Sequence, residues 1–531
     1  MSNDKRFIFG ITNAPCVFLL VVSVYVMCIT LVQINWSTTV YLLEQQCESS
    51  DADCNQETID HADTRTDIVL ENGHGIYDTI SGMTRFLSSF MPNQNKGNNE
   101  VIDDDIDDVT PDGFDACFLY NKLKKPGLPI VHSVFADSVS QQVVITGVLR
   151  NSFDAWHEQE FLCDFNHDYV KNKTISLVTM SDPIVQDFRR FGEEAQYSVV
   201  ITCPMPMKLH NKKTFQMNFR LASNPDIAYE NITVCQAATN KSPKYFLTMC
   251  TMTKDMDRYV PHWLDYHKMM GVEHVYIYDN SRKSILARTT RKHIKSGFLT
   301  IIPWSHKHSP TKTYLEVQVA SENDCMWRHK HISHWMMKID VDEFLQPLDP
   351  NRPTIPDYLK DRNLDLDHLG SVRIQNWFFC RHTVKYGLQQ LMNTRSVFER
   401  NLIRHAEPVP INRGRDKAIA RPANVHLYKI HGVKLGGDTL TLSPTSEMRM
   451  VHYRGDNPLH HGFCSGRQYA DFSMIRLWYK LNGGNVTDLN MHLGKMLPLM
   501  KKMGIKDANS LGISSELLDA SNTTSKTITG A

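Results

Sequence analysis

The spacing of apolar and polar residues differs between successive parts of this chain. Residues 116–240 contain short β-branched or alternating runs separated by Asn, Asp, Pro and Lys, which predicts a β-rich accessory module folded as a small β-sandwich. Cys163 and Cys203 lie in two of these runs, and we expect a disulfide bond between them. The pattern alone does not distinguish a carbohydrate-binding module from a packing domain.

From residue 244, apolar runs of strand length alternate with helix-like segments. The predicted strands are 244–252, 274–280, 298–304 and 335–344, and the predicted helices between them are 261–271, 282–296 and 312–331. Such alternation is typical of βαβ units, so we expect an α/β domain with a mostly parallel sheet and flanking helices. Residues 459–531 form a C-terminal extension with two helical stretches, 466–481 and 488–500, and a tail. We assign this extension no chemistry.

The N-terminal segment has the pattern of a membrane anchor. No charged residue appears between Arg6 and Glu44, and the span 14–34 contains about 19 mostly apolar residues, roughly enough to cross a bilayer as a helix. Basic residues precede it and acids follow, so residues 1–13 are predicted to be a cytoplasmic tail. A cleaved signal peptide is the alternative, although no small-x-small cleavage site follows the apolar run.

Residues 35–115 are acidic and poor in large apolar side chains, which predicts a flexible stem. A calcium-binding loop at 101–115 is an alternative for its most acidic part. The central Gly and terminal Glu of calcium loops are missing there, which favours the stem.

The length, the net charge and the cysteine spacing limit the classes of protein to which this chain can belong. A length of 531 residues predicts two folded domains, and a formal net charge of +0 with pI 7.3 argues against a general nucleic-acid binder. The cysteines outside the predicted membrane span show no CxxC spacing, so we expect structural disulfides rather than a zinc site. Glycosylation sequons, which agree with a lumenal location, occur at Asn172, Asn231, Asn485 and Asn522.

The stretch WMMKIDVDEFLQP ends a predicted strand with Asp340, Asp342 and Glu343. Residues two apart on a strand face the same side, so Asp340 and Asp342 would present oxygens to one point. Hard oxygen ligands suit Mg²⁺ or Mn²⁺. A solvated strand end is the plain alternative, but ligands of parallel sheets bind beyond the carboxyl ends of strands, where this cluster falls.

Other catalytic signatures are missing from the sequence. It has no G-x-x-x-x-G-K-[ST] phosphate loop, no HExxH and no G-x-S-x-G elbow. The acidic cluster therefore fits a metal that holds the diphosphate of a nucleotide sugar and acts as a Lewis acid in glycosyl transfer.

Two stretches together resemble glycosyltransferase family 92. They are FLTMCTMTKDMDRYVPHWLDYHKMMGVEHVYIYDNS and WMMKIDVDEFLQP, and the resemblance runs over about residues 245–454. It implies a GT-A-like catalytic domain at 244–458, preceded by a β-rich module. It also implies inverting transfer of a hexose, galactose above all, from a UDP-sugar to a glycan on a glycoprotein, glycolipid or polysaccharide.

The resemblance assigns roles to residues of this chain. The implied metal ligands for Mn²⁺, with Mg²⁺ as the alternative, are Asp340, Asp342 and His452. The implied donor-binding residues are Thr251, Lys254, Asp255, Asp279, Asn280, Ser281, Asp340, Lys417 and Arg421. Trp377 and His431 are implied to line the acceptor or sugar site, although a buried Trp377 would serve packing alone. Because inversion requires a general base, Asp456, Glu447 and Glu343 are the candidates.

These features combine into a single-pass type II Golgi membrane enzyme with a lumenal catalytic domain and no nucleic-acid partner. A catalytically inactive glycan-binding protein of the same fold is the main alternative. It is favoured by Lys254-Asp255, which stands where many family members have Asn-Glu. A metal-dependent phosphodiesterase is weaker, because a two-metal site needs more His and Asp ligands.

Overall fold

The structure is a computed structural model of the chain. It describes residues 122–507, except 151–159, 168–169, 176, 184–195, 307–314, 362–363, 365–366, 381–395, 412–414, 454–466 and 503. All of these fall in the compact unit Arg85–Ala531. The predicted tail, anchor and stem (1–115) lie outside the described residues. Within the described residues, no helix is long and apolar enough to cross a membrane.

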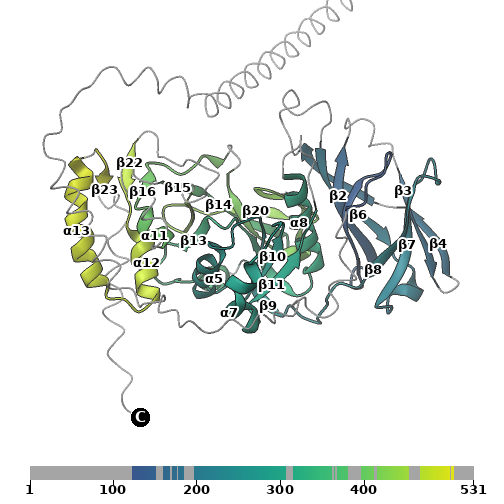
Figure 1. Ribbon diagram of the computed structural model, residues 1–531, viewed down its shortest axis with the longest axis horizontal. Helices are drawn as coiled ribbons and strands as arrows, with labels where there is room; N and C mark the ends of the chain where they lie inside the picture. The colour runs from purple at the N-terminus through teal and green to yellow at the C-terminus, as the bar shows by residue number, and fades with distance from the viewer. Residues whose placement is uncertain are drawn as a thin grey trace, which may run out of the picture. The chain divides into compact units, whose positions relative to one another are not determined.

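The predicted β-sandwich is present as two four-stranded sheets (Figure 1). One has the order β1 (Ile130–Asp137), β2 (Gln142–Arg150), β6 (Gln196–Pro204), β5 (Leu177–Pro183). The other has the order β4 (Val170–Ile175), β3 (Phe161–His167), β7 (Thr214–Leu221), β8 (Ala228–Cys235), with a short helix η3 (Met207–Leu209) before β7. The disulfide Cys163–Cys203 joins β3 to β6, as predicted, and so links the two sheets.

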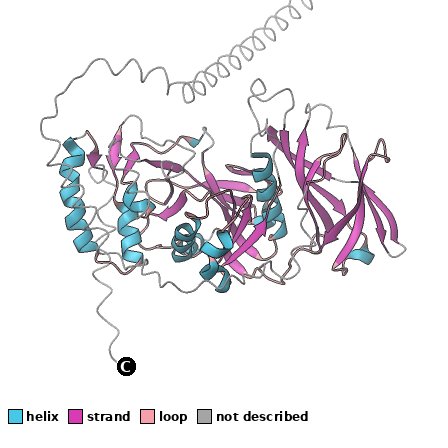
Figure 2. Ribbon diagram, in the orientation of Figure 1, coloured by secondary structure: helices cyan, strands magenta, loops and turns pink. Residues whose placement is uncertain are grey.

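The α/β part is built on a seven-stranded sheet (Figure 2). Its order is β11 (Leu299–Pro303), β10 (His274–Asp279), β9 (Tyr245–Thr253), β12 (Ser333–Lys338), β17 (Lys417–Ala420), β14 (Leu369–Ile374), β20 (Asp438–Thr441). Strand β17 runs antiparallel to both neighbours, whereas the other pairings are parallel. The expectation of a mostly parallel sheet is therefore confirmed.

Helices cover the two faces of this sheet because strand β9 is apolar on both sides. Leu247 and Met249 pack in one core with Trp263 of α5 (Val260–Met269). Cys250 points the other way and forms a disulfide with Cys325 of α8 (Leu315–Arg328). The remaining helices of this part are α6 (Leu286–Thr289), α7 (Arg291–Lys295), α9 (Ile355–Asp361) and η5 (Pro422–Asn424).

One predicted strand is wrong. The run 335–344 does not continue as a single strand, because β12 ends at Lys338 and β13 (Glu343–Pro347) joins a different sheet. A turn separates them: the Glu343 amide donates to the Asp340 carbonyl at 3.0 Å, and the Asp340 amide donates to Glu343 Oε2 at 2.8 Å. Asp340 and Asp342 therefore sit in a turn and not on a strand.

The second sheet has six strands and reaches into the C-terminal extension. Its order is β13, β21 (Met448–His452), β15 (Asn376–Cys380), β16 (Ile403–His405), β22 (Gln468–Ala470), β23 (Lys506–Asp507). Helices α11 (Val397–Arg400), α12 (Ser473–Leu481) and α13 (Val486–Lys502) accompany it, and β18 (Leu427–Lys429) and β19 (Gly432–Leu435) form a separate hairpin. The predicted helix 466–481 is thus shortened, because its first residues form β22.

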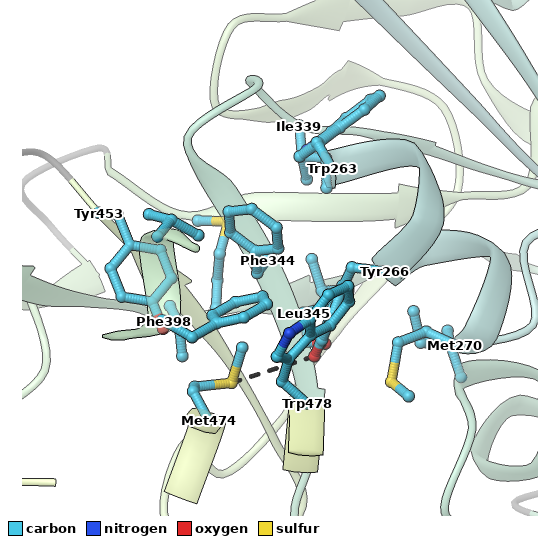
Figure 3. Packing of buried hydrophobic residues seen from close by; sticks show 14 of the residues in the cluster. Trp263, Tyr266, Met270, Ile339, Phe344, Leu345, Phe398, Tyr453, Met474 and Trp478 are labelled. Atoms are coloured by element: carbon cyan, nitrogen blue, oxygen red, sulfur yellow. Dashed lines mark hydrogen bonds between the residues drawn. The ribbon is translucent and has the colours of Figure 1, made fainter. Parts of the chain in front are cut away.

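An aromatic core fixes β13 next to α5 (Figure 3). The Trp263 indole donates to the Glu343 carbonyl at 3.0 Å, and the Tyr266 hydroxyl donates to the Leu345 carbonyl at 2.7 Å. Phe344 contacts the Tyr266 and Phe398 rings in edge-to-face geometry. Because these partners are buried, the strand that follows the acidic turn has one fixed position.

Helix α8 also joins the α/β part to the β-sandwich. Asp324 is fully buried and accepts hydrogen bonds from Ser133 of β1 and, at 2.6 Å, from Tyr278 of β10. Arg328 donates to the Ser133 hydroxyl at 2.6 Å and lies over the Phe135 ring, 4.3 Å from its centroid. These contacts pack the β-sandwich against helix α8, which agrees with the packing-domain alternative and leaves carbohydrate binding by the sandwich as a prediction.

Candidate active site

The strand order places the acidic turn at a switch point of the seven-stranded sheet. The chain leaves β9 toward β10 on one side and later returns to pair β12 with β9 on the other, so the direction of strand addition reverses between β9 and β12. Sheets of this kind bind ligands at such a switch point, beyond the carboxyl ends of the strands. Cys250 pairs with Lys338, so the ends of β9 and β12 meet at this edge.

The structure brings together the loops predicted to bind the donor. The Asp255 amide donates to the Ser281 hydroxyl at 2.8 Å, and the Asn280 amide donates to the Thr253 carbonyl at 2.8 Å. The Asp279 carboxylate accepts from the Ser281 amide at 2.9 Å and so fixes the turn after β10. Thr251 is buried inside β9, whereas Lys254 and Asp255 are exposed after the strand ends.

Asp340 is held between two buried lysines. Lys417 Nζ lies 2.6 Å from Asp340 Oδ2, and Lys338 Nζ lies 3.2 Å from Asp340 Oδ1. Burial alone would raise the pKa of Asp340, but the two ammonium groups outweigh it and hold that pKa far below its usual value. Asp340 is therefore a permanent anion whose charge is already compensated, although its side chain remains 36% exposed.

The two lysines belong to a longer row of alternating charges. Lys338 also contacts Glu322 of α8 at 2.6 Å, and Lys417 also contacts Glu343 at 3.2 Å. The row then continues from Glu343 to His452, 3.5 Å away. Buried charges are retained only where such partners offset the cost of desolvation, and removal of one partner exposes that cost.

Asp342 and His452 form a polar pair next to Glu343, at the end of this row of charges. His452 Nε2 lies 3.3 Å from Asp342 Oδ2, and the two side chains are 16% and 10% exposed. The pairing of β13 with β21 places Glu343 opposite His452 and thus carries His452 to the acidic turn. Burial opposes protonation of His452, but the carboxylates of Asp342 and Glu343 raise its pKa.

These residues fit a divalent ion in part. Among the described residues, no group of three or more His, Cys, Asp or Glu side chains is arranged to hold a metal. Asp342 and His452 supply two donors, and Mg²⁺ or Mn²⁺ commonly takes its other ligands from water and substrate phosphates.

Other predicted residues lie apart from this centre. Arg421 follows β17, whose antiparallel direction carries it away from Asp340, and its guanidinium lies 5.7 Å from the Trp335 ring centroid. Glu447 lies beyond the opposite end of the β13–β21 pair and accepts from the Tyr358 hydroxyl at 2.5 Å. Asp456 lies outside the described residues.

Trp377 is buried and its ring is covered, so the packing alternative describes it better than a sugar platform. The Arg404 guanidinium lies 4.1 Å and that of Arg449 5.3 Å from its centroid. The next residue, Phe378, points to the other face of β15, is partly exposed, and lies 5.1 Å from the His452 ring. Strand alternation alone offered either residue to the partly exposed face of β15, and the structure places Phe378 there.

Three residues near Lys417 complete the surroundings. His431, at the tip of the β18–β19 hairpin, has a pKa lowered to about 3 by burial and then by Lys417 and Lys338, so it is neutral. Arg415 is exposed and interacts electrostatically with His431. Burial raises the pKa of Asp416 to about 6. Arg415 and Asp416 were missed, although both stand within two residues of Lys417.

The model of the family described as Glycosyltransferase family 92 matches residues 245–477. The domain formed by residues 245–477 is therefore similar to glycosyltransferase family 92. This domain contains the acidic turn, Lys417, His452 and five of the six strands of the second sheet. The β-sandwich precedes it, and α13 and β23 follow it.

Three curated proteins named as family 92 members match this chain at low identity. A family 92 protein of Ricinus communis is 20% identical over 263 residues, which are 46% of this chain and 43% of the relative. A family 92 protein of Oryza sativa subsp. japonica is 27% identical over 116 residues, or 22% of this chain and 18% of the relative. One of Arabidopsis thaliana is 24% identical over 215 residues, 38% and 33% of the two chains. The chain spans less than half the length of these relatives.

Among solved structures, the mannosyltransferase PcManGT from Pyrobaculum calidifontis in complex with GDP-Man and Mn²⁺ is 12% identical. The match covers 42% of this chain and 61% of that chain, with a TM-score of 0.23. A score at that level establishes no common fold.

Proposed function

We propose that this protein is an inverting, metal-dependent glycosyltransferase that transfers a hexose from a UDP-sugar to a glycan acceptor, with galactose as the first sugar to test. The observation that carries the proposal is the Asp342–His452 pair, 3.3 Å apart at the switch point of a domain similar to family 92. The donor loops 253–255 and 279–281 adjoin the same edge of the sheet.

Asp342 and His452 would hold the divalent ion, Mn²⁺ first and Mg²⁺ second. When bound, such an ion neutralises the diphosphate of the leaving nucleotide. Two side chains lie behind His452 Nδ1: Asn376 Nδ2 at 3.0 Å and Glu343 Oε1 at 3.5 Å. When Nε2 is a ligand the ring proton must sit on Nδ1, and the Glu343 carboxylate is the group that would then accept it, in place of the Asn376 contact. Lys338 and Lys417 keep Asp340 ionised beside the pair.

The chain's own groups also have defined parts in the transfer. Arg415 is an exposed cation on the Lys417 side of the site and suits a phosphate contact, whereas Lys417 is engaged by two carboxylates. The general base must reach the acceptor hydroxyl. Glu343 is buried and engaged, and Glu447 is at the far end of its strand pair. Asp456, four residues after His452 in the sequence, is therefore the first base candidate to replace.

The proposed cellular setting follows the sequence. Residues 14–34 would anchor the protein in the Golgi membrane as a single-pass type II protein, with the catalytic domain in the lumen and glycoprotein, glycolipid or polysaccharide glycans as acceptors. Disulfide bonds at Cys163–Cys203 and Cys250–Cys325 suit an oxidising compartment.

The test is a donor and metal screen on a fragment that starts at residue 44. UDP-galactose should be consumed with Mn²⁺, and Asp342→Ala should reduce turnover by at least about 100-fold, because a metal ligand is lost. Asp438→Ala, an exposed aspartate of β20, is the matched control and should keep full turnover. A folded fragment that turns over no nucleotide sugar with any divalent ion would contradict the proposal.

A catalytically inactive glycan-binding protein is the second candidate. Both oxygens of Asp340 are engaged by lysines, and an exposed lysine, Lys254, stands in the donor loop. A fragment that binds glycans on an array but consumes no donor would favour this alternative.

A further inference from the structure

One glycosylation sequon lies on β8, the terminal strand of the sandwich sheet β4–β3–β7–β8. In this sequon, Asn231 and Thr233 are exposed, whereas Ile232 between them is buried in the sandwich core. Thr233 is paired with Gln216 of β7, which is exposed as well, so both lie on the outer face of the sheet. A glycan is bulky and hydrophilic, and a folded protein can carry one only at such a solvent-facing position.

The Asn231 side-chain amide has no hydrogen-bond partner in the part of the chain that the structure describes. The backbone of Asn231 has φ 55° at a bulge, where the β7–β8 register shifts between Met217 and Phe219. The backbone amide of Asn231 donates to Asn218 Oδ1 at 2.8 Å, which holds the bulge in place. The side-chain nitrogen is therefore available for a covalent bond.

Strand β8 has an uncovered stretch along its outer edge, and Asn231 lies in this stretch. At one end of the strand, Lys125 Nζ donates to the Ala228 carbonyl at 3.1 Å. Just beyond the other end, the Ala237 amide donates to the Ala136 carbonyl of β1 at 2.8 Å. Between these two contacts, β7 is the one strand among those described that pairs with β8. An uncovered terminal strand can pair with another chain unless a bulge, a charge or a covering group prevents it.

We propose that Asn231 carries an N-linked glycan and that this glycan shields the outer edge of β8. The donor is a lipid-linked oligosaccharide diphosphate of the secretory pathway. The Asn231 side-chain nitrogen bonds to the anomeric carbon of the oligosaccharide, the bond from that carbon to the diphosphate breaks, and the nitrogen loses one proton. This inference rests on the proposed lumenal location, but not on donor choice or turnover by the catalytic domain.

The test is mass spectrometry of peptides from the full-length chain produced in a eukaryotic secretory cell line. Peptide N-glycosidase converts a glycosylated asparagine to aspartate, and the Asn231 peptide should show this conversion. Thr233→Ala should abolish the glycan, whereas Thr233→Ser should keep it. Thr487→Ala, which removes the Asn485 sequon at the start of α13, is the matched control and should leave the Asn231 glycan in place.

The Thr233 variants also separate modification from a structural role. Asn adopts a positive φ more readily than most residues, so the bulge alone is a possible reason for an asparagine at position 231. Thr233→Ala and Thr233→Ser both leave that asparagine unchanged, and a purely structural role predicts no difference in mass between them.

Size-exclusion chromatography tests the shielding of β8. The oligomeric fraction should be about two-fold or more larger for Thr233→Ala than for Thr233→Ser, because the edge of β8 is then uncovered. Enzymatic removal of the glycan from the folded, unsubstituted protein should give the same increase, and this measurement does not depend on how a variant folds.

The outcomes distinguish the inference from the proposed location. An unmodified Asn231 in a chain that carries a glycan at another sequon would overturn the inference and leave the lumenal location in place. A chain without a glycan at any sequon would overturn both. An occupied Asn231 whose glycan can be removed with no change in the oligomeric fraction would overturn the shielding of β8.

Discussion

Lys417 Nζ lies 2.6 Å from Asp340 Oδ2 and 3.2 Å from Glu343 Oε2, so one buried ammonium group bridges both ends of the acidic turn. Lys417→Met would leave two carboxylates without this cation. We expect the free energy of unfolding to fall by about 3–5 kcal/mol, the usual cost of breaking a buried ion pair.

Urea denaturation of the fragment that starts at residue 44 measures this loss. Lys429→Met, an exposed lysine of β18, should change stability by less than about 0.5 kcal/mol. The double variant Lys417→Met/Glu343→Gln should recover part of the loss, because one of the stranded charges is removed. If Lys417→Met were as stable as Lys429→Met, the bridge would have no energetic role.

Glu343→Gln should weaken metal binding without removing a ligand. Glu343 faces His452 Nδ1 at 3.5 Å, and carboxylates behind a ligating histidine commonly contribute 10- to 100-fold to affinity, so a decrease of about 10-fold is expected. Mn²⁺ titration in the presence of UDP, followed by electron paramagnetic resonance, gives the dissociation constant. Glu230→Gln, in the β-sandwich, is the matched control. Unchanged Mn²⁺ affinity would exclude the positioning role of Glu343.

Asp416 should make the free energy of unfolding depend on pH between about pH 4 and pH 6. Burial raises its pKa in the folded state to about 6, against about 3.9 in the unfolded chain. Between these values the folded state binds more protons, so the free energy of unfolding should fall as the pH rises from about 4 to 6, by about 2 kcal/mol. Asp416→Asn should flatten this part of the curve, as urea denaturation at several pH values would reveal. An unchanged slope would show that Asp416 titrates normally.

The β-sandwich should be required for a soluble catalytic domain. Phe135 of β1 shares a buried apolar cluster with Trp327 of α8 and Leu427 of β18, and removal of the sandwich exposes this cluster. A fragment of residues 244–531 should therefore aggregate, whereas residues 116–531 should give a monodisperse peak in size-exclusion chromatography. A monodisperse, cooperatively unfolding 244–531 fragment would show that the sandwich is a separable module.

The sequence predicted the features that depend on local pattern. The alternation of strands and helices from residue 244 fixed the parallel sheet, and the β-branched runs with Cys163 and Cys203 fixed the sandwich and its disulfide bond. The apolar run before Asp340 correctly predicted that the acidic residues lie at the carboxyl end of a strand in this sheet. The turn that ends β12 was not predictable from this run, because it depends on a hydrogen bond from the Asp340 amide to the Glu343 side chain.

The other residues of the site are positioned by pairings between strands that are far apart in the sequence. His452 reaches Asp342 only because β21 pairs with β13, and Arg421 is carried away because β17 runs antiparallel to β12. No local signal reports the direction of a strand. The choice between Trp377 and Phe378 depended on which face of β15 is covered, and distant Arg404 and Arg449 cover it.

Helix α8 is buried at every position from Val317 to its end at Arg328. Its polar side chains contact two different parts of the protein: Glu322 pairs with Lys338 next to the acidic turn, and Asp324 accepts a hydrogen bond from Ser133 of the β-sandwich. A fluorophore, a crosslinker or a set of random substitutions on this buried helix would therefore disturb either the Glu322–Lys338 pair or the Asp324–Ser133 hydrogen bond. A label or a set of substitutions is better placed in the loop after β9, where Lys254 and Asp255 are exposed to solvent.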